Sequence, residues 1–446
     1  MTVRALSVLL RPSRGDASTV ILPMFAFTII GAATYLTAAL ARLLWVTPDN
    51  GFGQYKILAV ALLAVLVVPA ATLATSAARL SARRREDRLA VLRLLGASSV
   101  SVRGIAVIEA TLVAASGAIL GLLVYTASAP TLVWVAVAGR VPLLDEVWLP
   151  LWTLGLLVLA LTAVAAVSAA LGLRRLIVSP LVVRMRTDAP RVRGARLLGG
   201  AIVLAGGATL LQLASASWGA VGITAGIVVV LIAVMAVLNL VGPFLVGWVA
   251  RRRHARARTA EHLIAARGVL ESPTTAWRQV SGVGLASFVA VPAGSVLGFL
   301  DMVQNGPTAI APEQLVFFAD IRTVVIVAAG MSYLLVACSV GVTQAASVLE
   351  RRGLYVSLDR LGMPVRVMER ARRSAVASPL LVAAIFPSSA AAILIAPVVG
   401  VSMFTTPLFM LTVVSCIAAG VALVQLGVTA TGPVLRHVLK EPHRAL

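Results

Sequence analysis

Residue types that carry catalysis are scarce in this sequence, and none of them stands in a catalytic pattern. A P-loop that cradles nucleotide phosphates requires G-x-x-x-x-G-K-[ST], and the two lysines of the chain, Lys56 and Lys440, lie outside such a motif. The four histidines form neither an H-E-x-x-H motif nor a Cys/His metal spacing: His254, His262, His437 and His443. We therefore predict that the chain is not an enzyme, holds no catalytic or metal site and binds no cofactor directly.

Glu109 borders an apolar run close to the end that we expect to face the cytoplasm. Proton- and ion-coupled carriers usually need ionisable side chains midway across the bilayer, so this position argues against that class. Two roles stay open for the carboxylate. It pairs with Arg103 or another cation and transmits loop movement to the following helix, or it extends to the membrane interface.

The composition of the chain identifies the solvent in which it folds. Soluble domains carry about 25% charged residues, whereas this chain of 446 residues is 12% charged and 60% hydrophobic, with a mean hydropathy of +0.99. A soluble core cannot bury so much apolar surface. The composition therefore predicts an integral membrane protein and excludes a cytosolic enzyme, a secreted disulfide scaffold and a disordered chain.

Eight uncharged runs are long enough to cross a membrane. A spanning helix needs about 20 residues, so six runs hold one span each, and the two longest hold two each, with breaks near 215–219 and 398–406. The sequence thus predicts an all-α integral membrane protein with about ten transmembrane helices, because it lacks the alternation of barrel strands. The runs are 17–41, 57–78, 110–139, 147–173, 197–250, 279–300, 323–349 and 374–435.

The distribution of basic residues predicts the orientation. Cytoplasmic loops retain Lys and Arg, and placing both termini in the cytoplasm puts 34 of the 38 basic residues inside. The net charge of +21 then reflects topology and contact with anionic membrane lipids, not nucleic-acid binding. We predict a multi-pass protein of the plasma membrane. The four basic residues left at the outer ends are Arg42, Lys56, Arg140 and Arg322.

Two inner loops, 79–110 and 349–375, resemble each other. At an offset of 266 residues, Leu92-x-x-Leu95-Gly96 matches Leu358-x-x-Leu361-Gly362, and Lys56 matches Arg322 in the preceding span. Glycine suits a helix end because its left-handed conformation carries no side-chain penalty. Each loop is therefore expected to form a short amphipathic helix along the inner surface. The alternative is two unrelated basic loops that share a common dipeptide.

This repeat divides the chain into four, two and four helices. Residues 1–17 are expected to lie on the inner surface, and residues 436–446 form a cytoplasmic tail. The first four-helix module covers 18–180 and the second covers 279–435, with basic loops and two linker helices at 181–278. A parallel repeat implies a pseudo-twofold axis along the membrane normal.

Residues 83–125 resemble the cytoplasmic-helix region of FtsX/MacB-like ABC transporter permeases. The shared features are an arginine-rich segment, the run from Leu89 to Ser98 that contains Leu95-Gly96, Glu109 early in the next helix, and Gly117-x-x-x-Gly121. The two glycines are expected to serve helix packing. The second loop matches less well, since Gly121 corresponds to Pro387.

The resemblance implies that the two loops dock on separate ABC ATPase subunits, two for each permease chain, which bind the ATP and Mg²⁺. It implies export or membrane extraction of a hydrophobic or peptide-like compound, because the loops 45–54 and 301–321 are too short for a large extracellular domain. The alternative is an FtsX-like regulatory subunit that acts on envelope machinery without transport. The residues implied in ATPase coupling are Arg85, Glu86, Arg88, Leu92, Arg93, Leu95, Gly96, Leu358, Arg360, Leu361 and Gly362.

Overall fold

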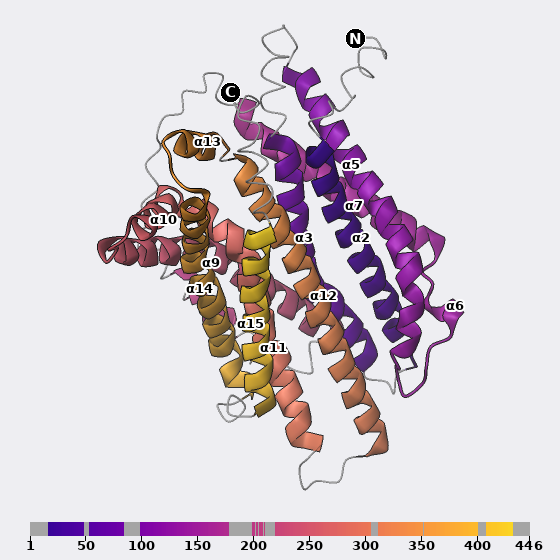
Figure 1. Cartoon of the computed structure of the whole chain (residues 1–446). Helices are drawn as coiled ribbons and strands as arrows, with labels where there is room; N and C mark the ends of the chain where they lie inside the picture. The colour runs from indigo at the N-terminus through magenta and orange to yellow at the C-terminus, as the bar shows by residue number, and fades with distance from the viewer. Residues whose placement is uncertain are drawn as a thin grey trace. The chain divides into compact units, whose positions relative to one another are not determined.

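The protein is described by a computed structural model in which long helices dominate (Figure 1). In the described ranges there is no β-strand, only an isolated bridge between Val137 and Arg140. The predicted all-α class is therefore confirmed. The structure describes residues 17–48, 53–83, 99–177, 219–304, 311–350, 352–399 and 407–430, with short pieces between 199 and 209.

The N-terminal part of the chain forms four long helices that follow the first four apolar runs. An outer connection with two short helical turns precedes the last of them. The elements are α2 (Ala17–Val46), α3 (Gln54–Arg83), α5 (Ser99–Ser128), the 3₁₀ turn η1 (Ala129–Trp134), α6 (Leu144–Val147) and α7 (Leu151–Ile177).

The C-terminal part repeats this order after a helix and a short surface helix. The longest apolar run is divided as expected, since one helix ends at Val399 and the next begins at Pro407. The elements are α9 (Gly219–Ala255), α10 (Ala260–Glu271), α11 (Pro273–Gln304), α12 (Pro312–Glu350), α13 (Arg352–Arg360), α14 (Val365–Val399) and α15 (Pro407–Ala430).

Eight of the described helices are long and apolar enough to cross a membrane. They expose large apolar side chains that water would not tolerate in such numbers, among them Leu123 (61%), Leu159 (65%) and Leu411 (65%). Lipid covers such faces in a membrane protein. The predicted count of ten stays a prediction, because most of the first linker span lies outside the described residues.

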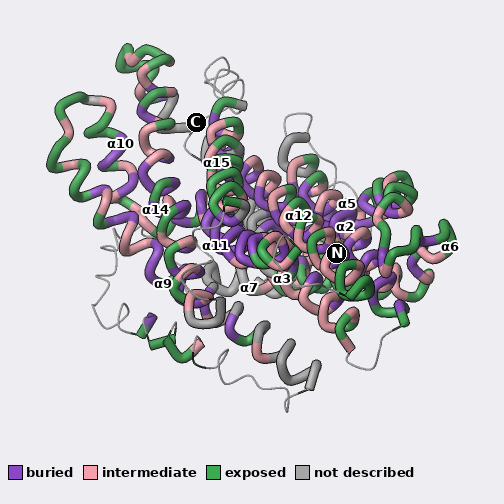
Figure 2. Tube along the Cα trace, turned by 90° about the horizontal axis from the view of Figure 1, so that it is seen from below, coloured by how far each residue is buried: buried purple, intermediate pink, exposed green. Residues whose placement is uncertain are grey.

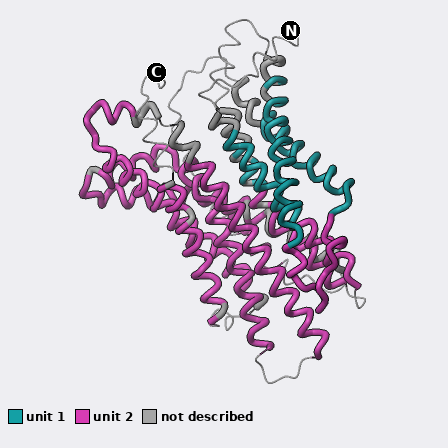
Figure 3. The backbone as a smooth tube through the Cα atoms, turned by 45° about the vertical axis from the view of Figure 1, so that its right-hand side comes forward, with its two compact units in different colours: residues 1–36, 71–130, 149–183 teal, residues 37–70, 131–148, 184–446 magenta. Residues whose placement is uncertain are grey.

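The chain divides into two compact units (Figure 3). Unit 1 contains residues 1–36, 71–130 and 149–183. Unit 2 contains residues 37–70, 131–148 and 184–446. The predicted domain boundaries follow the repeat instead and remain a prediction.

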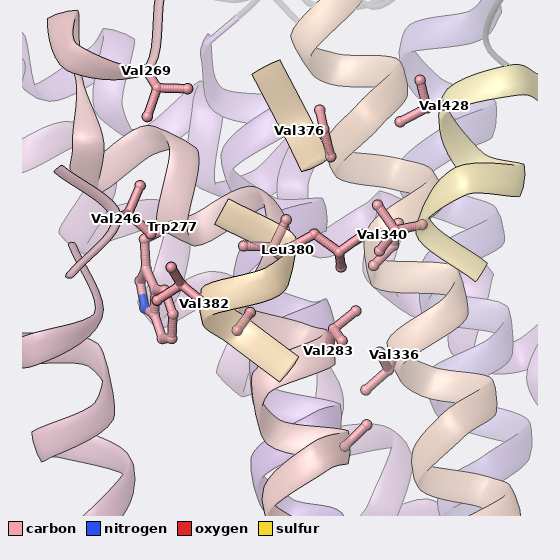
Figure 4. Close-up of a cluster of buried hydrophobic side chains, with 14 of the residues drawn as sticks. Val246, Val269, Trp277, Val283, Val336, Val340, Val376, Leu380, Val382 and Val428 are labelled. Atoms are coloured by element: carbon pink, nitrogen blue, oxygen red, sulfur yellow. The ribbon is translucent and has the colours of Figure 1, made fainter. Parts of the chain in front are cut away.

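In unit 2, α11 is the central helix, and 78% of its apolar stretch is buried (Figure 2). A cluster of valines surrounds it, including Val283 of α11, Val336 of α12 and Val376 of α14 (Figure 4). Trp277 lies at one end of this cluster and donates a hydrogen bond from Nε1 to Asn239 of α9 at 3.2 Å. The helices that flank the second inner loop therefore share one apolar core.

Candidate ATPase-coupling site

The second inner loop forms the expected short helix, α13, between the ends of α12 and α14 (Figure 1). Gly362 follows it with φ = +79°, the left-handed conformation in which glycine is favoured. The amide of Met363 donates to the carbonyl of Leu358 at 3.1 Å. The amide of Gly362 donates to the carbonyl of Asp359 at 2.9 Å. These two bonds form a Schellman motif, so the predicted helix stop at Gly362 is confirmed.

α13 has one anchored side and one open side. Val356 is buried, with 6% of its surface exposed, whereas Leu361 is 82% exposed. Arg360 is exposed beside it at the last helical position. A large apolar side chain next to a cation on an outward-facing turn is chemically suited to bind another protein, because aromatic, aliphatic and arginine side chains dominate such contacts.

The segment after α13 is fixed to the helix bundle. Met368 in the first turns of α14 is 3% exposed, and the guanidinium of Arg372 donates to the backbone carbonyl of Val428 in α15. α12 leads into α13 from the other side as a helix of 39 residues. At 1.5 Å per residue, α12 extends well beyond the hydrocarbon layer. A displacement of α13 would therefore move packed helices and not a loose loop.

The first inner loop cannot be compared side by side with α13. Residues 84–98 lie outside the described part of the chain, so the coupling roles expected there stay predictions. These residues are Arg85, Glu86, Arg88, Leu92, Arg93, Leu95 and Gly96.

Glu109 lies in α5, two residues inside the candidate span Val107–Trp134, and is half-buried. This position agrees with the expected place near one end of the span. Its pairing with Arg103 stays a prediction.

Gly117 and Gly121 of α5 lie directly against α2. A Cβ added at Gly117 would lie 2.7 Å from the carbonyl oxygen of Met24, and one at Gly121 would lie 2.7 Å from that of Thr28. The neighbouring Tyr35 hydroxyl donates to the carbonyl of Ala118 at 3.2 Å. The two glycines thus allow close approach of the helices, as the spacing indicated.

A polar contact in unit 2 was not predicted. Asp320 of α12 is 5% exposed and accepts hydrogen bonds at 2.8 Å from the hydroxyl of Tyr55 in α3 and from the amide of Ala138. Ala138 and Gly139 have φ of 54° and 72° at the tip of a tight turn. The buried carboxylate therefore fixes the outer connection between α5 and α7 to α12.

Two features of the sequence bear on this contact. Asp320 stands three residues before the uncharged run that begins at 323, and Ala138-Gly139 reads as a turn between apolar segments. Asp320 falls in the outer loop expected at 301–321, whereas Ala138 and Gly139 fall at the end of the uncharged run 110–139 that is expected to hold a span. Their proximity could not be predicted, because it depends on how α12 packs beside the outer connection.

The helices and their apolar outer faces define an α-helical, multi-pass integral membrane protein. Residues 58–177 match the family model described as FtsX-like permease C-terminal, so this part of the chain is similar to the FtsX-like permeases. This match confirms the resemblance to FtsX/MacB-like ABC transporter permeases. A comparison with curated proteins found no match.

The matched region runs from α3 through the first inner loop to the end of α7. Members of this family are membrane subunits without an ATPase site of their own and generally work with ABC ATPase partners. The match therefore suggests a permease-type membrane subunit.

Proposed function

We propose that this protein is the permease of an ABC transporter that exports, or extracts from the membrane, a hydrophobic or peptide-like compound. Two separate ATPase subunits would bind the ATP and Mg²⁺, one at each inner loop. Both termini would face the cytoplasm, since that orientation places most arginines inside.

The observation that carries the proposal is the geometry of α13. It is a short surface helix with a Schellman stop at Gly362, and it presents Leu361 at 82% exposure next to Arg360. In the predicted repeat α13 corresponds to residues 84–98, and that inner loop lies within the matched region 58–177. A docked ATPase would cover the exposed leucine and pair with the arginine.

The packing of unit 2 supports a path for the resulting movement. α13 is joined directly to α12 and α14, and both helices contribute to the core around Val283 of α11. Because close-packed cores shift as units, ATP-driven closure at α13 would move this group of helices together. The short outer connections favour direct handling of an amphiphilic substrate over signalling through an external domain.

The proposal is tested by reconstituting the chain in lipid vesicles with its partner ATPase and measuring ATP hydrolysis. The double variant Arg93→Glu with Arg360→Glu reverses one charge in each inner loop, and we expect it to lose most of the stimulation of ATPase activity by the permease. The matched control is Arg251→Glu with Arg267→Glu, which reverses two exposed charges elsewhere on the inner side. Unchanged stimulation in the first variant would overturn the docking role.

Transport and regulation are separated by the same vesicles. Export predicts ATP-dependent movement of a labelled amphiphilic peptide, whereas an FtsX-like regulatory subunit predicts normal ATPase stimulation without substrate movement. An ion-coupled carrier predicts that activity stops when the ion gradient is dissipated and persists when ATP is depleted.

A further inference from the structure

A basic pocket lies in unit 2 where α9 ends and α10 begins. Its volume is about 620 Å³, and its walls come from the last turns of α9, the first turns of α10 and the facing side of α14. Arg252, Arg253, Arg256 and Arg258 line one side, and Ser374 and Ser378 of α14 line another. The proposed ATPase docking does not use any of these residues.

The charges of the pocket are not neutralised from within. Its twelve lining residues include four arginines and no carboxylate, and in the described part of the chain none of the four forms an ion pair with a carboxylate. The nearby Glu261 of α10 lies 3.8 Å from Arg370 of α14, so its charge is engaged elsewhere. Several unpaired guanidinium groups around one cavity are suited to a phosphate, which they bind through charge-assisted hydrogen bonds.

Polar side chains at the start of α10 and on α14 also line the pocket. α10 begins at Ala260 with Thr259 as its N-cap, and Thr259 and His262 both line the pocket. The Thr259 hydroxyl accepts a hydrogen bond from the amide of His262 at 3.5 Å and lies 2.6 Å from Nδ1 of the same residue. Across the pocket, the hydroxyls of Ser374 and Ser378 supply further donors from α14.

The remaining walls are apolar. Val249, Ala265 and Ala266 lie beside the arginines, and Ala265 is 4% exposed. A pocket that joins an anion-binding rim to an apolar wall matches a molecule with a charged head and a hydrocarbon tail.

The surroundings place this pocket at a membrane interface. The guanidinium of Arg252 lies 3.8 Å from the ring centroid of Trp248, and tryptophan is enriched at the interface between hydrocarbon and headgroups. Leu263 and Ile264 on α10 are 42% and 40% exposed, which suits a helix that lies along the membrane surface.

We propose that this pocket binds an anionic phospholipid, with its phosphate among the four arginines and its acyl chain along the apolar wall. The same arginines could hold a soluble phosphate, but a soluble ion would leave the apolar wall and the exposed leucine and isoleucine of α10 without a role. Basic pockets between membrane helices on the cytoplasmic side are known in general to bind lipid headgroups.

The test uses the full chain in a non-ionic detergent and counts bound lipid by native mass spectrometry. Dioleoyl phosphatidylglycerol is compared with dioleoyl phosphatidylcholine in the same micelles, and inorganic phosphate is tested separately by thermal unfolding. Arg253→Gln with Arg256→Gln removes two pocket charges. We expect about thirtyfold weaker binding of phosphatidylglycerol, at about fivefold for each charge.

The control removes one exposed charge from each of the same two helices outside the pocket lining, with Arg251→Gln in α9 and Arg267→Gln in α10. This variant should keep wild-type affinity for phosphatidylglycerol. Equal weakening by both double variants, or equal binding of the two lipids, would show a diffuse surface effect and overturn the site. Stabilisation by inorganic phosphate without preference for phosphatidylglycerol would assign the arginines to a soluble anion instead. Arg256→Gln alone repeats the test if the double variant does not fold.

Discussion

Gly121 lies so close to α2 that its missing side chain is part of the helix contact. A Cβ there would stand 2.7 Å from the carbonyl oxygen of Thr28 and 2.9 Å from the amide nitrogen of Ala32. Both neighbours are backbone atoms, which cannot rotate away as a side chain would. Close helix approach through small residues is a major source of association in membranes, where apolar burial gives little.

Gly121→Ala is therefore expected to destabilise the protein, although alanine favours helix. Overpacking a close contact costs about 1–3 kcal/mol, which should lower the midpoint of thermal unfolding in detergent. Gly104→Ala is the matched control on α5, because no atom lies within 4 Å of its added Cβ. That change should be neutral or stabilise by up to about 1 kcal/mol. Equal midpoints for the two variants would contradict the close contact.

Sequence reasoning at this scale identified residue types but not their partners. The spacing of Gly117 and Gly121 predicted a packing face, yet nothing in the sequence identified α2 as the helix they touch. Asp320 shows the same limit more sharply. It falls in the outer loop expected at 301–321, and its hydrogen bonds to Tyr55 and Ala138 arise from segments far apart in the chain.

The end of α13 depends on a backbone conformation that glycine alone adopts without cost. Gly362 has φ = +79°, and no atom lies within 4 Å of the position of its Cβ. A substitution there is strained by its backbone and not by crowding. A substitution at Gly362 therefore tests the backbone conformation at the end of α13 without changing side-chain packing.

Gly362→Ala should weaken ATPase docking while membrane insertion and overall stability stay close to wild type. A non-glycine residue in the left-handed region costs about 1–2 kcal/mol, and if docking requires the stopped helix, affinity for the ATPase should fall about tenfold. Pull-down titration of the partner ATPase measures this. Gly341→Ala in α12 is the control, since its added Cβ also meets nothing within 4 Å. If Gly362→Ala bound the ATPase with wild-type affinity, docking would not require the Schellman motif.

Element boundaries were predictable only where charge marks the membrane edge. The uncharged run at 323–349 located α12, but the helix begins at Pro312, eleven residues earlier. The helix continues through Asp320 and Arg322 because a helix needs an apolar environment only within the hydrocarbon layer. Hydropathy predicts the part of a helix that lipid surrounds. It does not predict how far the helix extends beyond the hydrocarbon layer, where the inner and outer contacts form.

The two groups of four helices agree in which helix is most buried and which is least buried, and this agreement supports the repeat at the scale of the molecule. In the first group, 61% of the apolar stretch of α2 is buried and 17% of that of α7. In the second group, the corresponding values are 78% for α11 and 18% for α15. Each group thus has its first helix in the interior and its fourth helix most open to lipid. Two unrelated loops that share a dipeptide would not account for this agreement.

A second correspondence lies in the contact between the first and third helices. In the first group the glycines are on α5 and face α2. In the second group Pro387 occupies the place of Gly121 on α14, and the glycine is on α11 instead, where a Cβ at Gly284 would lie 3.2 Å from Pro387. The close approach is kept while the small residue has moved to the other helix, so the weaker sequence match of the second group does not signal a lost contact.

A repeat with two docking segments predicts a stoichiometry that can be counted. Wild-type permease should bind two ATPase subunits, and Arg360→Glu with Leu361→Glu should leave one, because the first inner loop is unchanged. Mass photometry of the detergent-solubilised complex distinguishes one from two bound subunits. Two bound subunits in the variant would place the contact away from α13. If the variant binds no ATPase subunit, both subunits must dock together, as expected if the ATPase binds as a preformed dimer. The single variant Arg360→Glu, which keeps Leu361, would then show whether the charge or the apolar contact is needed to bind the ATPase.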